Sequence, residues 1–215
     1  MFKEELSASM GKFLMENEHK MIVAAKDCIY FAKRYSDILA FYIRCKDKRN
    51  HGGGIKVDFF FMPIVIPNDD VFLSGAGVCI KVFPEGGICE GDVMLSAGRK
   101  IVALEGSMDK FSDIILRELE NPFFPNGKLP VNTITFIIYN KIREDKNMQQ
   151  EFGVLEKDVC KLMKGKKTKE AYQQCHDFMK RLPPDYFESN GISINPNIDS
   201  KRFAEQIYAQ HILGA

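Results

Sequence analysis

The most reactive side chains of this chain stand together at Cys175-His176-Asp177, where a thiol, an imidazole and a carboxylate follow one another. A cysteine nucleophile needs a base within hydrogen-bond reach. Consecutive helical residues point about 100° apart, so these three cannot converge on one atom from a single helix. A base would have to come from elsewhere, and His51 and His211 are the candidates. We expect Cys175 to face the core, and His176 and Asp177 to face solvent.

Three glycine-containing strings have parts of known substrate-binding loops. His51-Gly52-Gly53-Gly54 has the composition of an esterase oxyanion loop, but the G-x-S-x-G string that presents the serine is absent. Gly75-Ala76-Gly77 has neither a third glycine at position 80 nor a following helix, as a dinucleotide loop requires. Gly165-Lys166 is followed by Lys167, where a P-loop needs serine or threonine. We expect turns and bulges at these glycines, and no nucleotide or other cofactor.

The sequence also lacks a clear metal site and a clear pair of catalytic carboxylates. No C-x-x-C or H-x-x-x-H string occurs, which argues against zinc sites with local ligand pairs. His211 follows Ile207 by about one helical turn, which favours a core or boundary position over a ligand. Carboxylates near the expected strand ends and turns could line a cleft, although a solvated surface explains them better: Asp58, Asp69, Asp70, Glu85, Glu90 and Asp92. Glu90 and Asp92 would share one face of a strand. We assign no catalytic, cofactor-binding or metal-binding residue.

A basic cluster lies between positions 157 and 169. Lys157, Lys161 and Lys164 are spaced by four and three residues, on a polar face beside an apolar stripe over 154–163. Such a face can bind phosphate groups. Asp158 interrupts it, and neither arginine nor an aromatic side chain belongs to it, so a solvated helix face is the favoured interpretation.

Length and composition are those of an ordinary globular protein. The 215 residues suffice for one well-buried core, and a single domain over 1–215 is expected. Hydrophobic residues make up 45% and charged residues 27%, and the net charge of +1 favours neither an acidic nor a basic partner. A weak seam, if present, falls at 143–150, before a helical part over 151–215.

The six cysteines and the apolar runs indicate the compartment. Cys28, Cys79 and Cys160 lie inside apolar patterns, which favours free, reduced thiols. The start of the chain is acidic and does not resemble a signal peptide. The longest uncharged apolar run, over 59–66, is far shorter than the roughly 20 residues that span a bilayer. We expect a soluble, cytoplasmic protein without membrane insertion.

Residues 21–45 are predicted to form a buried N-terminal helix at the centre of the fold. Wound as a helix, this segment places its charged residues on one face, and most of its other positions are apolar. A strand over 38–45 is the alternative. Ahead of it, an apolar stripe from Phe2 to Leu14 predicts a first helix.

A β-rich segment over 55–105 is expected to follow. Alternating β-branched and aromatic residues between turn signals predict strands over residues 55–66, 71–83, 88–97 and 100–105. The turns at 67–70 and 84–87 are too short for parallel crossovers, so the strands form an antiparallel meander. Pro63 removes a donor from the ladder, which favours a sheet edge or a bulge at that position.

The rest of the chain is mostly helical. Ser107 can cap a helix whose apolar stripe covers 111–119, and the alternation over 131–142 predicts one further strand. Three C-terminal helices are expected, around 154–163, 172–179 and 200–213. The predicted fold is α+β, with a mostly antiparallel sheet of about five strands packed on the buried N-terminal helix, and with C-terminal helices.

These features favour a non-enzymatic protein–protein interaction module, adaptor-like or chaperone-like. The 10 methionines and 17 phenylalanines suit a surface that accepts an apolar helix or strand of another protein, and an edge at Pro63 could pair with a strand. The general shape is similar to small helix–sheet–helix adaptors of bacterial secretion systems, without a shared motif. The alternatives are an enzyme that uses Cys175, His176 or the turn carboxylates, and nucleic-acid association through residues 157–169.

Overall fold

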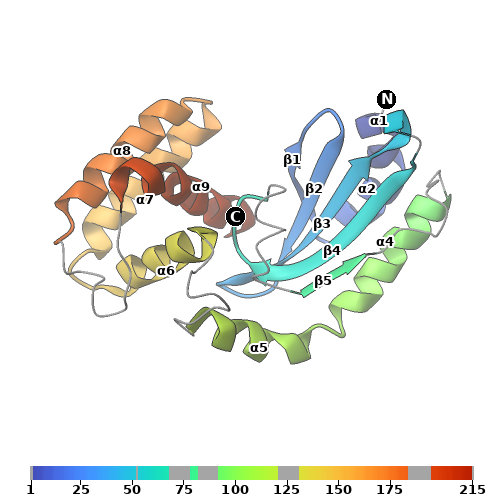
Figure 1. Ribbon diagram of the computed structural model, residues 1–215, viewed down its shortest axis with the longest axis horizontal. Helices are drawn as coiled ribbons and strands as arrows, with labels where there is room; N and C mark the ends of the chain where they lie inside the picture. The colour runs from blue at the N-terminus through green and yellow to red at the C-terminus, as the bar shows by residue number, and fades with distance from the viewer. Residues whose placement is uncertain are drawn as a thin grey trace. The chain divides into compact units, whose positions relative to one another are not determined.

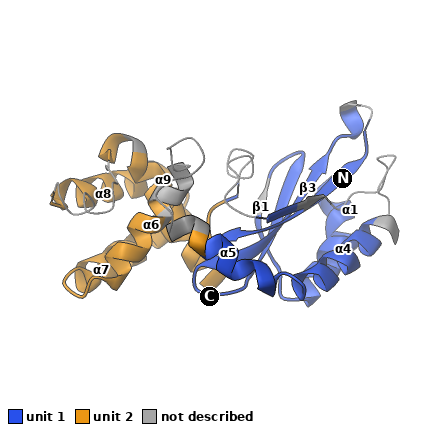
Figure 2. Ribbon diagram, turned by 60° about the horizontal axis from the view of Figure 1, so that its bottom comes forward, with its two compact units in different colours: residues 1–63, 67–116 blue, residues 64–66, 117–215 orange. Residues whose placement is uncertain are grey.

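The computed structural model describes residues 2–51, 53–67, 78–81, 92–120, 131–183 and 195–214. These residues form two compact units, shown in Figure 2. Unit 1 contains residues 1–63 and 67–116, and unit 2 contains residues 64–66 and 117–215. The predicted seam at 143–150 falls inside unit 2, and the prediction of one domain over 1–215 stays a prediction.

Unit 1 is built on a five-stranded antiparallel sheet of order β1-β2-β3-β4-β5 (Figure 1). Its strands are β1 (Lys20–Ala24), β2 (Cys28–Arg34), β3 (Leu39–Asp47), β4 (Ile55–Pro63) and β5 (Val78–Lys81). Each strand pairs with its neighbour in the chain. From β1 to β4 the strands are joined by short connections, which suit antiparallel pairing. The predicted α+β class and the antiparallel sheet of about five strands are confirmed.

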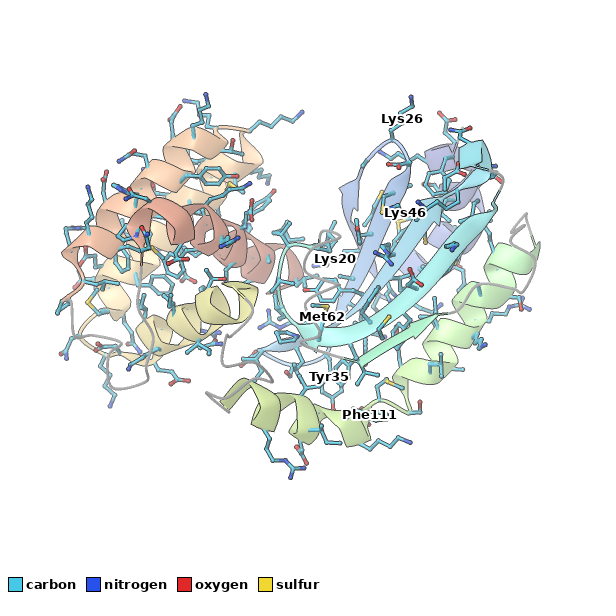
Figure 3. All side chains as sticks on the ribbon, viewed as in Figure 1. Lys20, Lys26, Tyr35, Lys46, Met62 and Phe111 are labelled. Carbon is cyan, nitrogen blue, oxygen red and sulfur yellow. The ribbon has the colours of Figure 1, made fainter. Side chains whose placement is uncertain are left out.

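The two faces of the sheet differ, because directly paired residues share a face. One face is apolar, with Phe31, Ile43, Phe59 and Ile80 in register across β2 to β5. The other face pairs Arg44 with Asp58 and Lys46 with Lys56. Figure 3 shows Lys20, Lys46 and Met62 on this polar face. The second face also carries buried side chains such as Tyr42 and Phe60, so both faces of the sheet are covered. On the apolar face, a layer of helices of unit 1 provides the cover.

Helices α1 (Phe2–Ala8), α2 (Met10–Glu16) and α4 (Asp92–Glu105) provide that layer. The fit of α2 is close, since a Cβ atom added at Gly11 would lie 3.1 Å from the ring of Phe31. Helix α4 packs on α2 at Gly98, where a Cβ atom would lie 2.9 Å from Met10 Cγ. The predicted helical stripe from Phe2 to Leu14 is confirmed, as two short helices.

Unit 2 is helical, with α6 (Val131–Glu144), α7 (Gln149–Lys164), α8 (Thr168–Arg181) and α9 (Pro196–Gly214). Its core stacks Phe152, Phe178 and Phe203 from α7, α8 and α9, with ring centroids 6.1 to 6.4 Å apart. Residues 64–66 join this unit because Gln206 Nε2 donates to the Ile64 carbonyl oxygen, at 2.5 Å. The three predicted C-terminal helices are confirmed, and so is the helix after Ser107, which is α5 (Asp109–Glu120).

The predicted central helix over 21–45 is wrong, since this segment forms β1, β2 and β3. The first five residues of both β2 and β3 are buried, so neither strand shows the period of two that marks a half-exposed strand. A strand buried on both faces and a buried helix have similar apolar runs, and tertiary pairing decides between them. The alternative strand over 38–45 corresponds to β3.

Three predicted strands are also wrong. Residues 92–105 form α4 in place of strands over 88–97 and 100–105, and residues 131–144 form α6 in place of a strand over 131–142. In α4 the buried residues recur at helical intervals of three and four, as Met94, Ala97 and Ile101. Packing against neighbouring helices outweighs the β propensity of these apolar stretches.

The prediction for Pro63 is an edge or a bulge at that position; β4 as a whole is not an edge strand, because it lies between β3 and β5. Pro63 is the last residue of β4 and pairs with Leu39 of β3. On the other side of β4, the described pairing with β5 reaches only as far as Phe61, which pairs with Val78. Most of the predicted turn at 67–70, and all of the predicted turn at 84–87, lie outside the described residues, as does most of the predicted strand over 71–83.

Candidate functional site

The Cys175-His176-Asp177 group lies on α8 and points in different directions. Cys175 is fully buried, His176 is half-buried and Asp177 is exposed. His176 Nε2 lies 3.1 Å from Asn197 Oδ1 and its Nδ1 lies 3.3 Å from Asp177 Oδ1. The imidazole thus joins α8 to the first turn of α9. The core position of Cys175 is confirmed, as is the solvent position of Asp177, whereas His176 is less exposed than predicted.

Of the two candidate bases, only the side chain of His211 is described. His211 is exposed on α9, so its predicted core or boundary position is wrong. The side chain of His51 lies outside the described residues. Burial and the nearby Cys160 raise the pKa of Cys175 to about 12, and burial and Glu156 raise the pKa of Cys160 to about 11. A nucleophilic thiolate needs a lowered pKa, so this environment opposes that chemistry.

Among the predicted carboxylates, Asp58 belongs to an ion pair on the polar face of the sheet. Its Oδ2 atom accepts hydrogen bonds from Arg44 Nη2 at 2.6 Å and from Arg44 Nε at 3.0 Å. The Arg44 guanidinium also lies over the ring of Phe60. Asp92 begins α4, so the expected strand that would pair it with Glu90 is wrong. The other four carboxylates, Asp69, Asp70, Glu85 and Glu90, lie outside the described residues.

The described glycines of the candidate loops have structural roles. Gly165-Lys166 ends α7 in a Schellman motif, in which Lys167 N donates to Leu162 O and Lys166 N donates to Met163 O. Gly53 N donates to Lys48 O, and Lys48 N donates to Gly54 O, which closes the connection between β3 and β4. Gly75 and Gly77 lie outside the described residues.

The lysines between 157 and 169 are all exposed, which confirms the solvated helix face. Association with nucleic acid through them stays a prediction. Within the described ranges, no group of three or more His, Cys, Asp and Glu side chains could hold a metal ion. No helix in the part of the chain that the structure describes is long and apolar enough to cross a membrane.

A groove between α7 and α8 combines the features of a binding site. It has a volume of about 630 Å³. Leu155 and Phe178, both buried, contribute to its lining, and Val154 lines it with 58% of its surface exposed. Charged side chains also line it: Glu151, Asp158, Asp177 and Arg181. An apolar surface beside fixed charges is typical of sites that recognise a side chain or a peptide segment.

The charged lining is partly organised by hydrogen bonds. Arg181 Nη2 lies 2.7 Å from Glu151 Oε1, which connects α8 with α7. Asp177 Oδ1 accepts a hydrogen bond from Gln173 Nε2 at 2.9 Å. Hydrogen bonds to His176 and Gln173 lower the pKa of Asp177, so its carboxylate remains ionised at neutral pH.

Comparison with known proteins gives no match to this chain, either among family models or among curated proteins or solved structures.

The sequence prediction missed this groove, although it used several of its residues. Val154 was assigned to the apolar stripe with Leu155, and Asp158 was treated as an interruption of the lysine cluster. The sequence does contain a weak sign that Val154 is exposed. On a helix, Val154 lies about 100° away from Leu155 and outside the buried face formed by Phe152, Leu155 and Val159. Recognising the groove also requires the pairing of α7 with α8.

Proposed function

We propose that this protein is a non-enzymatic protein-binding module, adaptor-like in role, and that the α7/α8 groove receives its partner. The observation that carries this proposal is Val154, a large apolar side chain left 58% exposed in a groove lined by carboxylates. Completing the burial of such a side chain contributes up to about 1.5 kcal/mol, a gain that a bound partner would supply. Single exposed apolar residues are common, and the surrounding groove is what distinguishes this one.

The shape of the groove favours a helical partner over an extended strand. Its lining residues recur along α7 at 150, 151, 154, 155 and 158, with Asn147 just before this helix, and along α8 at 174, 177, 178 and 181. Residues spaced by three and four form the facing ridges of two neighbouring helices. A third helix packs into such a depression through its own apolar stripe. The expected partner segment is therefore an amphipathic helix.

The proposed setting is the cytoplasm. In the described part of the chain, none of the cysteines forms a disulfide bond: Cys28, Cys45, Cys79, Cys160 and Cys175. Free thiols persist where glutathione and thioredoxin keep them reduced.

A display library of 16-residue amphipathic helices, with randomised charges, tests this function on the full chain. Selected peptides are expected to bind Val154→Ser at least tenfold more weakly than the wild type, a loss of about 1.4 kcal/mol. Ile114→Ser is the matched control, because Ile114 is also an exposed apolar helical residue but lies on α5. Peptides whose affinity is unchanged by Val154→Ser would contradict a binding site in this groove.

A further inference from the structure

We infer that the partner helix is basic, with a Lys or Arg side chain that takes the place of Arg181 beside Glu151. This inference rests on the proposed function and names the partner class of the same groove. It starts from the balance of charges in the lining. Glu151, Asp158 and Asp177 oppose the single cation Arg181, so the groove carries a net charge of −2.

Arg181 shows which chemistry the groove accepts. Its guanidinium pairs with Glu151 at 2.7 Å and also lies over the ring of Phe178, with Cζ 5.9 Å from the centroid. A carboxylate beside an aromatic ring is a favourable environment for a guanidinium. The chain thus already places one cationic side chain in this environment, and a partner arginine would meet the same two groups.

The Arg181–Glu151 pair can be displaced at little cost. Both side chains are largely exposed, at 66% for Arg181 and 46% for Glu151. Exposed ion pairs contribute little to stability because water and salt screen them. A competing cation on a helix that also buries Val154 would gain the burial of this side chain, which is 58% exposed in the chain alone. Arg181 therefore acts as an internal competitor for the partner.

The spacing of the carboxylates predicts the pattern of the partner. Glu151 and Asp158 are seven residues apart on α7, which corresponds to about 10 Å along the helix. Val154 lies between them in the sequence. A partner helix with basic residues at i and i+7 and a leucine at i+3 or i+4 matches both charges and the apolar position.

The experiment uses the full chain and two synthetic 16-residue helices with the same leucine stripe, one flanked by lysines and the other by glutamates. We expect the lysine peptide to bind at least about tenfold more tightly, as measured by titration calorimetry at 0.15 M salt. Asp158→Lys is expected to weaken the binding of the lysine peptide about tenfold. Arg181→Gln is expected to strengthen it several-fold, because the competing cation is removed.

Glu170→Lys provides the matched control, since it makes the same charge change on an exposed α8 residue that does not line the groove. It should change the affinity of the lysine peptide less than about twofold, because salt screens distant charges. Equal effects of Asp158→Lys and Glu170→Lys would overturn the inference. So would tighter, Val154-dependent binding of the glutamate peptide, which would leave the proposed function standing. Binding that Val154→Ser does not affect would instead overturn the proposed function.

Discussion

His19 Nε2 lies 2.5 Å from Glu105 Oε1, and both side chains are buried in unit 1. The pair joins the residue before β1 to the last residue of α4. His19 Nδ1 lies 3.1 Å from the Leu14 carbonyl oxygen, and Lys33 Nζ lies 3.6 Å from Glu105 Oε2. The two buried side chains of His19 and Glu105 thus connect α2, α4 and β2.

Glu105→Ala should strongly destabilise unit 1. The substitution leaves the buried imidazole of His19 without its carboxylate partner, and a buried polar group left unsatisfied costs about 1–3 kcal/mol. Chemical denaturation of the full chain measures the loss. Glu16→Ala is the control, because Glu16 meets Lys12 only at 4.0 Å on the surface and should change stability by less than about 0.5 kcal/mol. Equal effects of the two substitutions would contradict a structural role for the buried pair.

Replacing Gly11 and Gly153 with alanine should change the free energy of unfolding in opposite directions. Gly11→Ala should destabilise by about 1–3 kcal/mol, because its Cβ atom would lie 2.8 Å from the Leu6 carbonyl oxygen, which belongs to the backbone. Gly153→Ala should stabilise by about 0.5–1 kcal/mol, since Gly153 lies inside α7 and nothing is within 4 Å of the added atom. Urea denaturation compares them. A stabilising Gly11→Ala would show that α1 and α2 can separate at no cost.

Lys166→Gly should stabilise the end of α7. Lys166 has φ of 61°, the left-handed conformation that glycine adopts without a steric penalty. The expected gain is about 1 kcal/mol, read from the thermal midpoint by circular dichroism. Lys164→Gly, inside the last turn of the same helix, should instead cost about 1 kcal/mol. The prediction fails if both substitutions destabilise.

The stability of unit 2 should fall above pH 9. The pKa values of Cys160 and Cys175 are raised to about 11 and about 12 in the folded chain, chiefly by burial. Between the ordinary thiol pKa, about 8.5, and these values, the unfolded chain binds fewer protons than the folded chain, so the free energy of unfolding decreases as pH rises. The stabilisation that comes from keeping these two thiols protonated is fully present below about pH 8. The buried phenol of Tyr139, whose pKa is also raised chiefly by burial, acts in the same direction at higher pH.

Urea denaturation at pH 8 and pH 10 tests this pH dependence. The wild type should lose roughly 1 kcal/mol more per buried thiol than a Cys160→Ala, Cys175→Ala double variant. Parallel losses in the two proteins would show that the thiols are ionised to the same degree in folded and unfolded chains.

The class of the fold could be predicted, because it depends on features that are local in the chain. The apolar stripes of α7, α8 and α9 and the β-branched and aromatic residues of β4 are such features. The strands within residues 21–45 could not be predicted, because β2 and β3 are buried on both faces and lack an alternating pattern. Their pairing, which brings Phe31, Ile43 and Phe59 together, is visible only in the folded structure. The same limit explains α4 and α6, whose apolar residues suit strands when neighbours are ignored.

The candidate site was harder to predict than the fold. The residues that drew attention by chemical type, Cys175 and His176, have core and helix-joining roles. The groove depends instead on ordinary residues such as Val154 and Asp158, which acquire significance only because α7 and α8 lie side by side. No single string of the sequence describes such a surface.

The sequential order of the strands has a consequence for synthesis on the ribosome. Every pairing of β1 to β4 lies within the first 63 residues, so contacts form between segments that are close in the chain, an arrangement associated with rapid folding. At about 5–20 residues per second, translation from β4 to the end of α8 takes about 6–24 s. The nascent chain can therefore pair these four strands well before the α7/α8 groove exists to be bound.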